Sequence, residues 1–125
     1  MEIFRILGTI AAVLLFFQIA LFVFRRIYKY SPKKPKFFIP FLKFLKNAHI
    51  YTGISLLIIG FVHGILALGT IRLHTGWIFW FVIASSFVGY LMRNKIGKKW
   101  IFIHRIVGLI LIGLFFIHKF FPWIF

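Results

Sequence analysis

The chain has 125 residues, of which 62% are hydrophobic and 22% are aromatic, and 16 Lys and Arg face a single acidic residue, Glu2. The absence of cysteine excludes disulfides, iron–sulfur clusters and covalently attached c-type haem, and the single carboxylate excludes paired-carboxylate catalysis. Long apolar stretches predict an integral membrane protein with an all-α fold, and this prediction argues against a nucleic-acid-binding protein despite the net charge of +15.

Four apolar stretches predict four membrane-spanning helices, at about 3–24, 47–70, 76–92 and 101–121. Each is close to the roughly 20 residues that cross the hydrocarbon. The fourth contains Arg105 near one end and Lys119 near the other, where long cationic side chains can reach the headgroups. We therefore expect one membrane domain, 1–125, folded as a four-helix transmembrane bundle.

The first and second predicted helices are joined by a basic segment, 25–46. Its middle holds Pro32 and Pro35, which resist helix formation, and the rest interleaves Phe and Leu with Lys. This pattern predicts a short amphipathic piece in the membrane interface, whose role is anchoring.

The cations indicate how the chain is oriented. They gather in the first and third connections, whereas the second holds only Arg72. The positive-inside rule then places those two connections in the cytoplasm and both termini outside, in a membrane of the prokaryotic cytoplasmic type. The basic rim is expected to bind anionic lipid headgroups, and it would also suit an acidic redox partner.

Four of the five histidines form two pairs with one spacing. His49 and His63 are 14 residues apart in the second predicted helix, and His104 and His118 are 14 apart in the fourth. Fourteen residues advance a helix by about 21 Å and nearly complete four turns, so each pair lies on one face at two depths. Two crossings separate His63 from His104, so the helices run the same way, and His49 must meet His104 while His63 meets His118. This arrangement predicts two six-coordinate haems stacked between the two helices.

The two histidine segments, HIYTGISLLIIGFVH and HRIVGLILIGLFFIH, share the pattern H-x3-G-x9-H. Gly53 and Gly108 therefore lie near the ligand face, where a missing side chain would admit a flat macrocycle, although small-residue helix packing explains such a glycine equally well. Arg105 and Lys119 each follow a histidine and are candidates to hold haem propionates, with headgroup contact as the equal alternative.

The paired histidines resemble those of transmembrane cytochrome b domains, and the stretch KKWIFIHRIVGLILIGLFFIH is most similar to the ferric-reductase-like transmembrane group. The resemblance covers the second to fourth predicted helices. It implies two haem b molecules, one held by His49 with His104 and one by His63 with His118, and electron transfer across the membrane. The larger members have about six spans and a flavin or nicotinamide domain, so here the electron donor must belong to a partner.

The function expected is that of a di-haem b-type cytochrome that relays electrons between a cytoplasmic donor and an outer acceptor, as a subunit rather than a complete oxidoreductase. A flavoprotein and an extracytoplasmic electron carrier are the expected partners, and a quinone is a further candidate. One alternative is a stand-alone quinol dehydrogenase or ferric reductase. Another is a non-redox metal transporter or assembly subunit, for which the histidines of each helix lie too far apart to share one ion.

Overall fold

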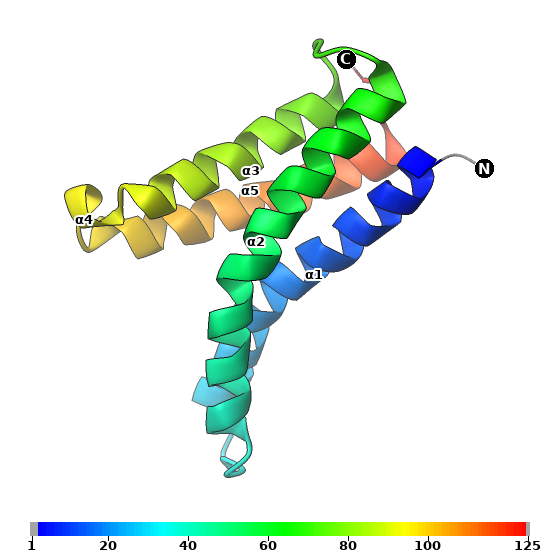
Figure 1. Cartoon of the computed structure of the whole chain (residues 1–125). Helices are drawn as coiled ribbons and strands as arrows, with labels where there is room; N and C mark the ends of the chain where they lie inside the picture. Colours follow the sequence, from blue (N-terminus) through cyan, green and yellow to red (C-terminus); the bar gives the residue numbers. More distant parts are fainter. Residues whose placement is uncertain (1–2, 125) are drawn as a thin grey trace.

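A computed structural model describes residues 3–124, and over that range the fold is all-α, as predicted. The helices are α1 (Ile3–Tyr30), α2 (Phe38–Leu68), α3 (Thr75–Leu91), the short α4 (Arg93–Ile96) and α5 (Lys99–Phe120). Figure 1 shows α1 packed beside α2 and α3 beside α5. The two hairpins meet near the chain termini and diverge toward the α1–α2 connection and α4.

Three of the described helices, α1, α2 and α5, are long and apolar enough to cross a membrane. The fourth predicted span is present as α3, which is apolar but has only 17 residues. At 1.5 Å per residue α3 extends about 25 Å, at the lower end of the range that spans a bilayer. The helices therefore support a membrane protein with three clear candidate spans and one shorter apolar helix.

The basic segment 25–46 is not a separate element. Helix α1 continues to Tyr30 and α2 already begins at Phe38, so the segment consists of two helix ends and a short connection. Pro32 and Pro35 lie in that connection. Pro40 lies in the first turn of α2, where backbone N–H groups have no acceptor within the helix, so a proline is tolerated there. Helix α2 is consequently 31 residues long, longer than the predicted 47–70.

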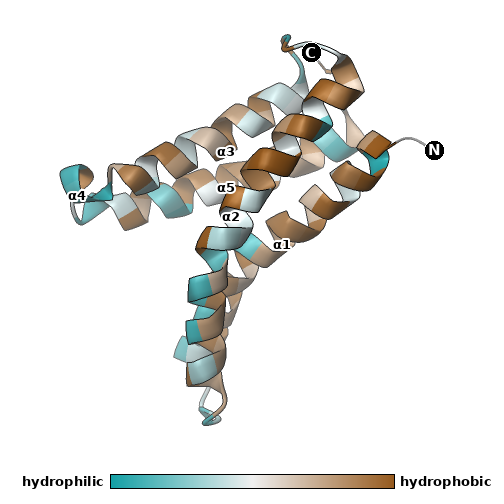
Figure 2. Cartoon of the chain, viewed as in Figure 1, coloured by the Kyte–Doolittle hydropathy of each residue, from teal (hydrophilic) through white to brown (hydrophobic). Residues whose placement is uncertain are grey.

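The outer surface of the helices is apolar. Val13, Ile58 and Leu109, from three different helices, are 62%, 59% and 61% exposed. Figure 2 shows hydrophobic residues along α1, α2 and α5, with hydrophilic residues concentrated at the α1–α2 connection and at α4. A surface of this kind is suited to contact with lipid, which solvates apolar side chains as well as a protein interior does.

The centre of the molecule is a layer of four aliphatic side chains, one from each long helix. These are Leu15 of α1, Leu56 of α2, Ile83 of α3 and Leu111 of α5, all between 3% and 9% exposed. Leu56 is seven residues from each histidine of α2, and Leu111 is seven from each paired histidine of α5. This central aliphatic layer therefore lies midway between the two histidine levels.

Two tryptophans of α3 join the hairpins by packing on glycines of α2. A Cβ atom at Gly60 would lie 3.1 Å from the Trp80 ring, and one at Gly64 would lie 3.1 Å from the Trp77 ring. Trp80 also donates its indole N–H to the carbonyl oxygen of Leu57 at 2.8 Å. Small residues in α2 thus let large rings of α3 approach its backbone closely.

Shortening a side chain of the central aliphatic layer should destabilise the fold. We expect Leu111→Ala to lower the free energy of unfolding by about 2–5 kcal/mol, because it opens a cavity between four helices. Leu109→Ala, two residues away on the exposed face of α5, is the matched control and should change stability by less than about 0.5 kcal/mol. Unfolding in detergent micelles measures both, and equal losses would contradict the assignment of the layer.

Candidate functional site

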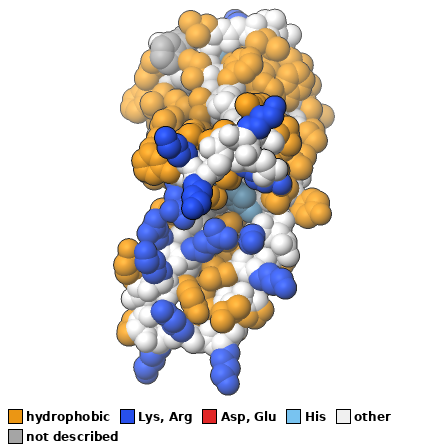
Figure 3. All heavy atoms as spheres, turned by 90° about the vertical axis from the view of Figure 1, so that its left-hand side faces the viewer, with side chains coloured by type: hydrophobic (Ala, Val, Ile, Leu, Met, Phe, Trp, Pro, Cys, Tyr) orange, Lys and Arg blue, Asp and Glu red, His pale blue; other side chains and the backbone are white. Residues whose placement is uncertain are grey.

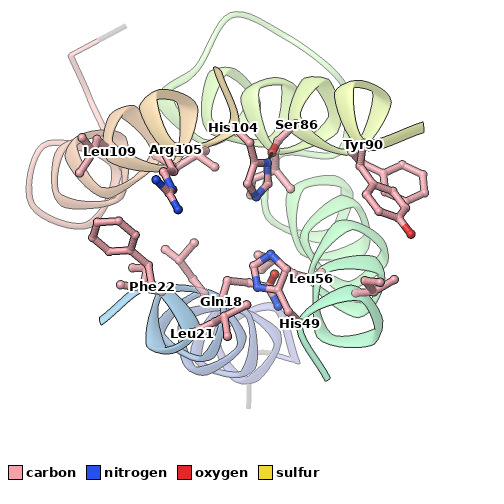
Figure 4. A pocket seen from close by; sticks show the side chains of 18 of the residues that line it. Gln18, Leu21, Phe22, His49, Leu56, Ser86, Tyr90, His104, Arg105 and Leu109 are labelled. Atoms are coloured by element: carbon pink, nitrogen blue, oxygen red, sulfur yellow. Dashed lines mark hydrogen bonds between the residues drawn. The ribbon is translucent and has the colours of Figure 1, made fainter. Parts of the chain in front are cut away.

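The four paired histidines meet in two levels. His49 of α2 lies beside His104 of α5 with ring centroids 5.9 Å apart, and His63 lies beside His118 with centroids 6.5 Å apart. In both pairs the ring planes are inclined at 80°. Figure 4 shows the rings of His49 and His104 facing one another from opposite helices. Helices α2 and α5 therefore run in the same direction.

These histidines face each other across open space rather than across a helix–helix contact. Among the described residues α1 packs along α2 and α3 along α5, but α2 and α5 do not pack along each other. Two cavities lie between the hairpins, one of about 310 Å³ at His49 and His104 and one of about 560 Å³ at His63 and His118. We call them the His49 cavity and the His63 cavity. Their volumes fall in the range of small-molecule and cofactor sites.

Hydroxyl groups of α3 orient both paired histidines of α5. The Nδ1 atom of His104 lies 3.1 Å from Ser86 Oγ, and that of His118 lies 3.0 Å from Thr75 Oγ1. Thr75 donates its own hydroxyl proton to the carbonyl oxygen of Pro122 at 3.2 Å, so its oxygen accepts the N–H of His118. The Nε2 atom of His118 then carries no proton and is free to bind a metal.

The two histidines of α2 differ from each other. The Nδ1 atom of His63 lies 2.6 Å from the carbonyl oxygen of Phe4, which can only accept, so Nδ1 carries the proton there too. The Nδ1 atom of His49 is buried and has no hydrogen-bond partner among the described residues. Helix α1 therefore holds His63 by a short hydrogen bond, whereas His49 lies near the Gln18 backbone of α1 without a hydrogen bond of ordinary geometry.

Two glycines leave room for the imidazole rings of the His63 level. A Cβ atom at Gly8 would come within 2.9 Å of Cε1 of His63, and one at Gly76 within 2.9 Å of Cε1 of His118. Contacts that short do not occur for real Cβ atoms, so any side chain would displace the imidazole. Neither glycine shares a helix with the histidine that it faces, so no local sequence pattern identifies them.

Gly53 and Gly108, which the sequence predicts to lie near the ligand face, have different surroundings. Gly53 lines the His49 cavity and also packs on α1, because its Cβ would lie 3.2 Å from Oε1 of Gln18. The Gln18 amide donates to the hydroxyl of Thr52, an interhelical hydrogen bond that ties α1 to α2. Gly108 also lines the His49 cavity, and no atom lies within 4 Å of the position of its Cβ.

Each cavity is lined by cations. Arg105 lines the His49 cavity together with Arg25 and Arg26, and Lys119 lines the His63 cavity together with Arg5. Figure 3 shows Lys and Arg gathered on one face around a hollow in which histidine is visible, and Figure 4 shows Arg105 beside His104. Because residues 3–124 include no Asp or Glu, the potential in both cavities is positive and favours anionic groups such as carboxylates.

Trp100, Ser86 and Thr75 are further residues of the site. The Trp100 ring lies 4.6 Å from that of His104, centroid to centroid. Ser86 and Thr75 are eleven residues apart, about three helical turns, and so lie on one face of α3. That spacing of hydroxyls opposite a histidine pair is the signal that could have identified them.

No protein-family model, curated protein or solved structure matches this chain. The resemblance to ferric-reductase-like domains therefore stays a prediction, and the chemistry of the site must be argued from its own geometry.

The donor set at each level fits a metal held in a flat macrocycle. Within residues 3–124 no three His, Cys, Asp or Glu side chains are grouped to hold a metal ion. Two imidazoles line the His49 cavity and three line the His63 cavity, where the His74 ring lies 6.0 Å from that of His118, centroid to centroid, and its Nδ1 accepts the Gly76 N–H. With a metal–nitrogen bond of about 2.0–2.1 Å and about 1.1 Å from nitrogen to ring centre, two imidazoles on opposite sides of one metal have centroids about 6.3 Å apart. The observed 5.9 and 6.5 Å lie on either side of that value.

A methyl group added beside the His63 level should weaken cofactor binding at that level and not at the other. We expect Gly76→Ala to displace the His118 ring and weaken binding of iron protoporphyrin at that level about 10–100-fold, with the His49 level unchanged. Gly113→Ala on α5, where no atom lies within 4 Å of the added Cβ, is the control and should bind both equivalents normally. Haemin titration followed by absorbance measures both variants, and normal binding by Gly76→Ala would contradict the predicted contact.

Proposed function

We propose that this chain is a membrane-bound b-type cytochrome that holds two haems and relays single electrons between a donor on one side of the membrane and an acceptor on the other. The observation that carries the proposal is the geometry of the two imidazole pairs. Their centroid separations, 5.9 and 6.5 Å, suit two ligands of one metal. They also lie 14 residues apart along both helices, a spacing of about 21 Å.

The histidines would hold the haems, His49 with His104 and His63 with His118. Bound haem iron supplies reversible one-electron chemistry between its ferric and ferrous states, without transfer of atoms. The hydroxyls of Ser86 and Thr75 lie within hydrogen-bond distance of Nδ1 of His104 and His118, and a neutral imidazole that donates to them presents an unprotonated Nε2 to the cavity. Neutral imidazoles bring little charge into the membrane, which lowers the cost of burying the site.

The remaining parts of the cavities have separate tasks in this proposal. The central aliphatic layer excludes water between the two levels, and it lies about 10.5 Å along the helix from each of them. Arg105, Arg25 and Arg26 at one cavity and Lys119 and Arg5 at the other are placed to bind carboxylates such as haem propionates.

Partners complete the relay. The chain carries no Gly-rich nucleotide-binding motif, so a flavoprotein subunit is the proposed donor on the cytoplasmic side and an extracytoplasmic carrier the proposed acceptor. The cation-rich connections at 31–37 and around α4 face the cytoplasm in this proposal, with both termini outside.

Haem content of the purified full-length chain tests the proposal. Production with added haem should give two haem b per polypeptide in a pyridine haemochrome assay. His63→Ala or His118→Ala should retain one, and His49→Ala combined with His63→Ala should retain none. His74→Asn tests the alternative ligand, because the His74 ring lies 6.0 Å from that of His118, centroid to centroid. Asn preserves the cap that accepts the Gly76 N–H at the start of α3, and this variant should keep both haems. A folded, haem-supplied chain without colour would refute the proposal.

The ring planes predict the spectrum of the oxidised protein. Imidazoles inclined at 80° to each other would, on binding one haem iron, leave the two iron dπ orbitals that they perturb close in energy. We expect low-spin ferric EPR signals of the highly anisotropic type, with a large maximal g value, from both haems. Low-temperature EPR of the oxidised chain makes the measurement, and the ordinary rhombic signal of parallel imidazoles would show that the rings are arranged differently.

A further inference from the structure

The two histidine levels differ in how many ring N–H groups have an acceptor. At the His63 level both do, since Nδ1 of His63 bonds the Phe4 carbonyl oxygen and Nδ1 of His118 bonds Thr75. At the His49 level Nδ1 of His104 lies 3.1 Å from Ser86 Oγ, and Nδ1 of His49 makes no hydrogen bond of ordinary geometry among the described residues, although the backbone of Gln18 lies near this ring. The two levels therefore have the same type of ligand but differ in the hydrogen bonds that the ligand rings make.

Thr75 is the strongest of these partners because its own hydrogen bonding fixes its role. It is the one polar side chain of the described residues that is buried, at 3% exposed, and it stands at the first position of α3. Its hydroxyl proton is committed to the Pro122 carbonyl oxygen, beyond the end of α5. The hydroxyl therefore acts toward His118 as an acceptor, and it connects the imidazole to a backbone carbonyl.

A hydrogen bond from the ring N–H to an acceptor makes an imidazole a stronger electron donor, because it gives the ring partial imidazolate character. A stronger donor stabilises ferric over ferrous iron and so lowers the reduction potential. Two such bonds act at the His63 level and one at the His49 level.

The charges in the cavities act in the same direction. Three arginines, Arg25, Arg26 and Arg105, line the His49 cavity, whereas Arg5 and Lys119 line the His63 cavity. Nearby positive charge favours the reduced iron, which is one unit less positive, and so raises the potential of the His49 level. Hydrogen bonding and charge therefore both separate the reduction potentials of the two levels.

Resting on the proposed function, we infer that Thr75 is a positioning residue that fixes the His118 ring and makes the His63-level haem the lower-potential centre of the two. Electrons at equilibrium then reside preferentially at the His49 level, the side on which the cations gather. Helix α3, which contributes no paired histidine, thereby contributes to the redox asymmetry of the chain through the Thr75 hydroxyl.

The first test needs no haem. The chain is labelled with ¹⁵N at histidine, reconstituted in nanodiscs of neutral lipid, and the His118 ring is observed by NMR. The wild type and Thr75→Ser should show the proton on Nδ1, and Thr75→Val, which has the same shape without the hydroxyl, should lose that preference. An unchanged His118 tautomer in Thr75→Val would overturn the positioning role, whether or not the chain binds haem.

The second test is a redox titration of the haem-loaded chain. The haem absent from His63→Ala identifies the His63 level, and in the wild type it should titrate at the lower potential. Thr75→Val should shift that haem alone to a more positive potential, and Thr75→Ser should restore it. Equal potentials, the opposite order, or a shift of both haems would overturn the inference.

Ser86→Ala provides a second variant should Thr75→Val fold poorly. Ser86 is less buried, and its loss should raise the potential of the His49-level haem only, widening the gap between the levels. A narrowed gap would overturn the inference. A chain that shows the expected His118 tautomer but takes up no haem would instead refute the proposed function, so the two failures are distinguishable.

Discussion

Every feature of the site depends on α2 and α5 running in the same direction without packing along each other. Parallel direction brings equivalent histidines to equal depth, and the separation between the helices leaves two cavities instead of one helix–helix seam. Antiparallel neighbours α1 and α3 maintain that separation, because each packs on one histidine helix and Trp77 and Trp80 of α3 join the two hairpins. The central aliphatic layer then divides the space into two levels.

Sequence patterns predicted the all-α fold, the apolar helices and the face on which the histidines lie, because these follow from composition and from the helical repeat. The structure joins the basic segment to the second predicted span, because α2 begins at Phe38 and a proline in a first helical turn does not interrupt a helix. The length of α3 was close to the prediction, but its 17 residues make it a shorter element than the other three. Whether these helices form a four-helix transmembrane bundle around two haems stays a prediction.

The partners of the histidines could not be predicted from local sequence. Gly8 and Gly76 face imidazoles on other helices, and the Phe4 carbonyl belongs to the backbone, so no pattern along the chain identifies them. Thr75 and Ser86 could be predicted from the sequence, because their hydroxyls lie on one face of the helix that precedes the second histidine pair. Leu56 and Leu111 could be predicted in the same way, since each lies midway along the sequence between two histidines.

Each histidine level is divided between two hairpins, with one imidazole from α1/α2 and one from α3/α5. The α1/α2 hairpin supplies one paired histidine to each level, so a chain stalled after its first two helices would offer only half of every pair. Cofactor capture would then depend on complete insertion into the bilayer, and it would tie together two halves that otherwise touch mainly through α2 and α3. Binding of the prosthetic group would therefore distinguish fully inserted chains from partly inserted ones.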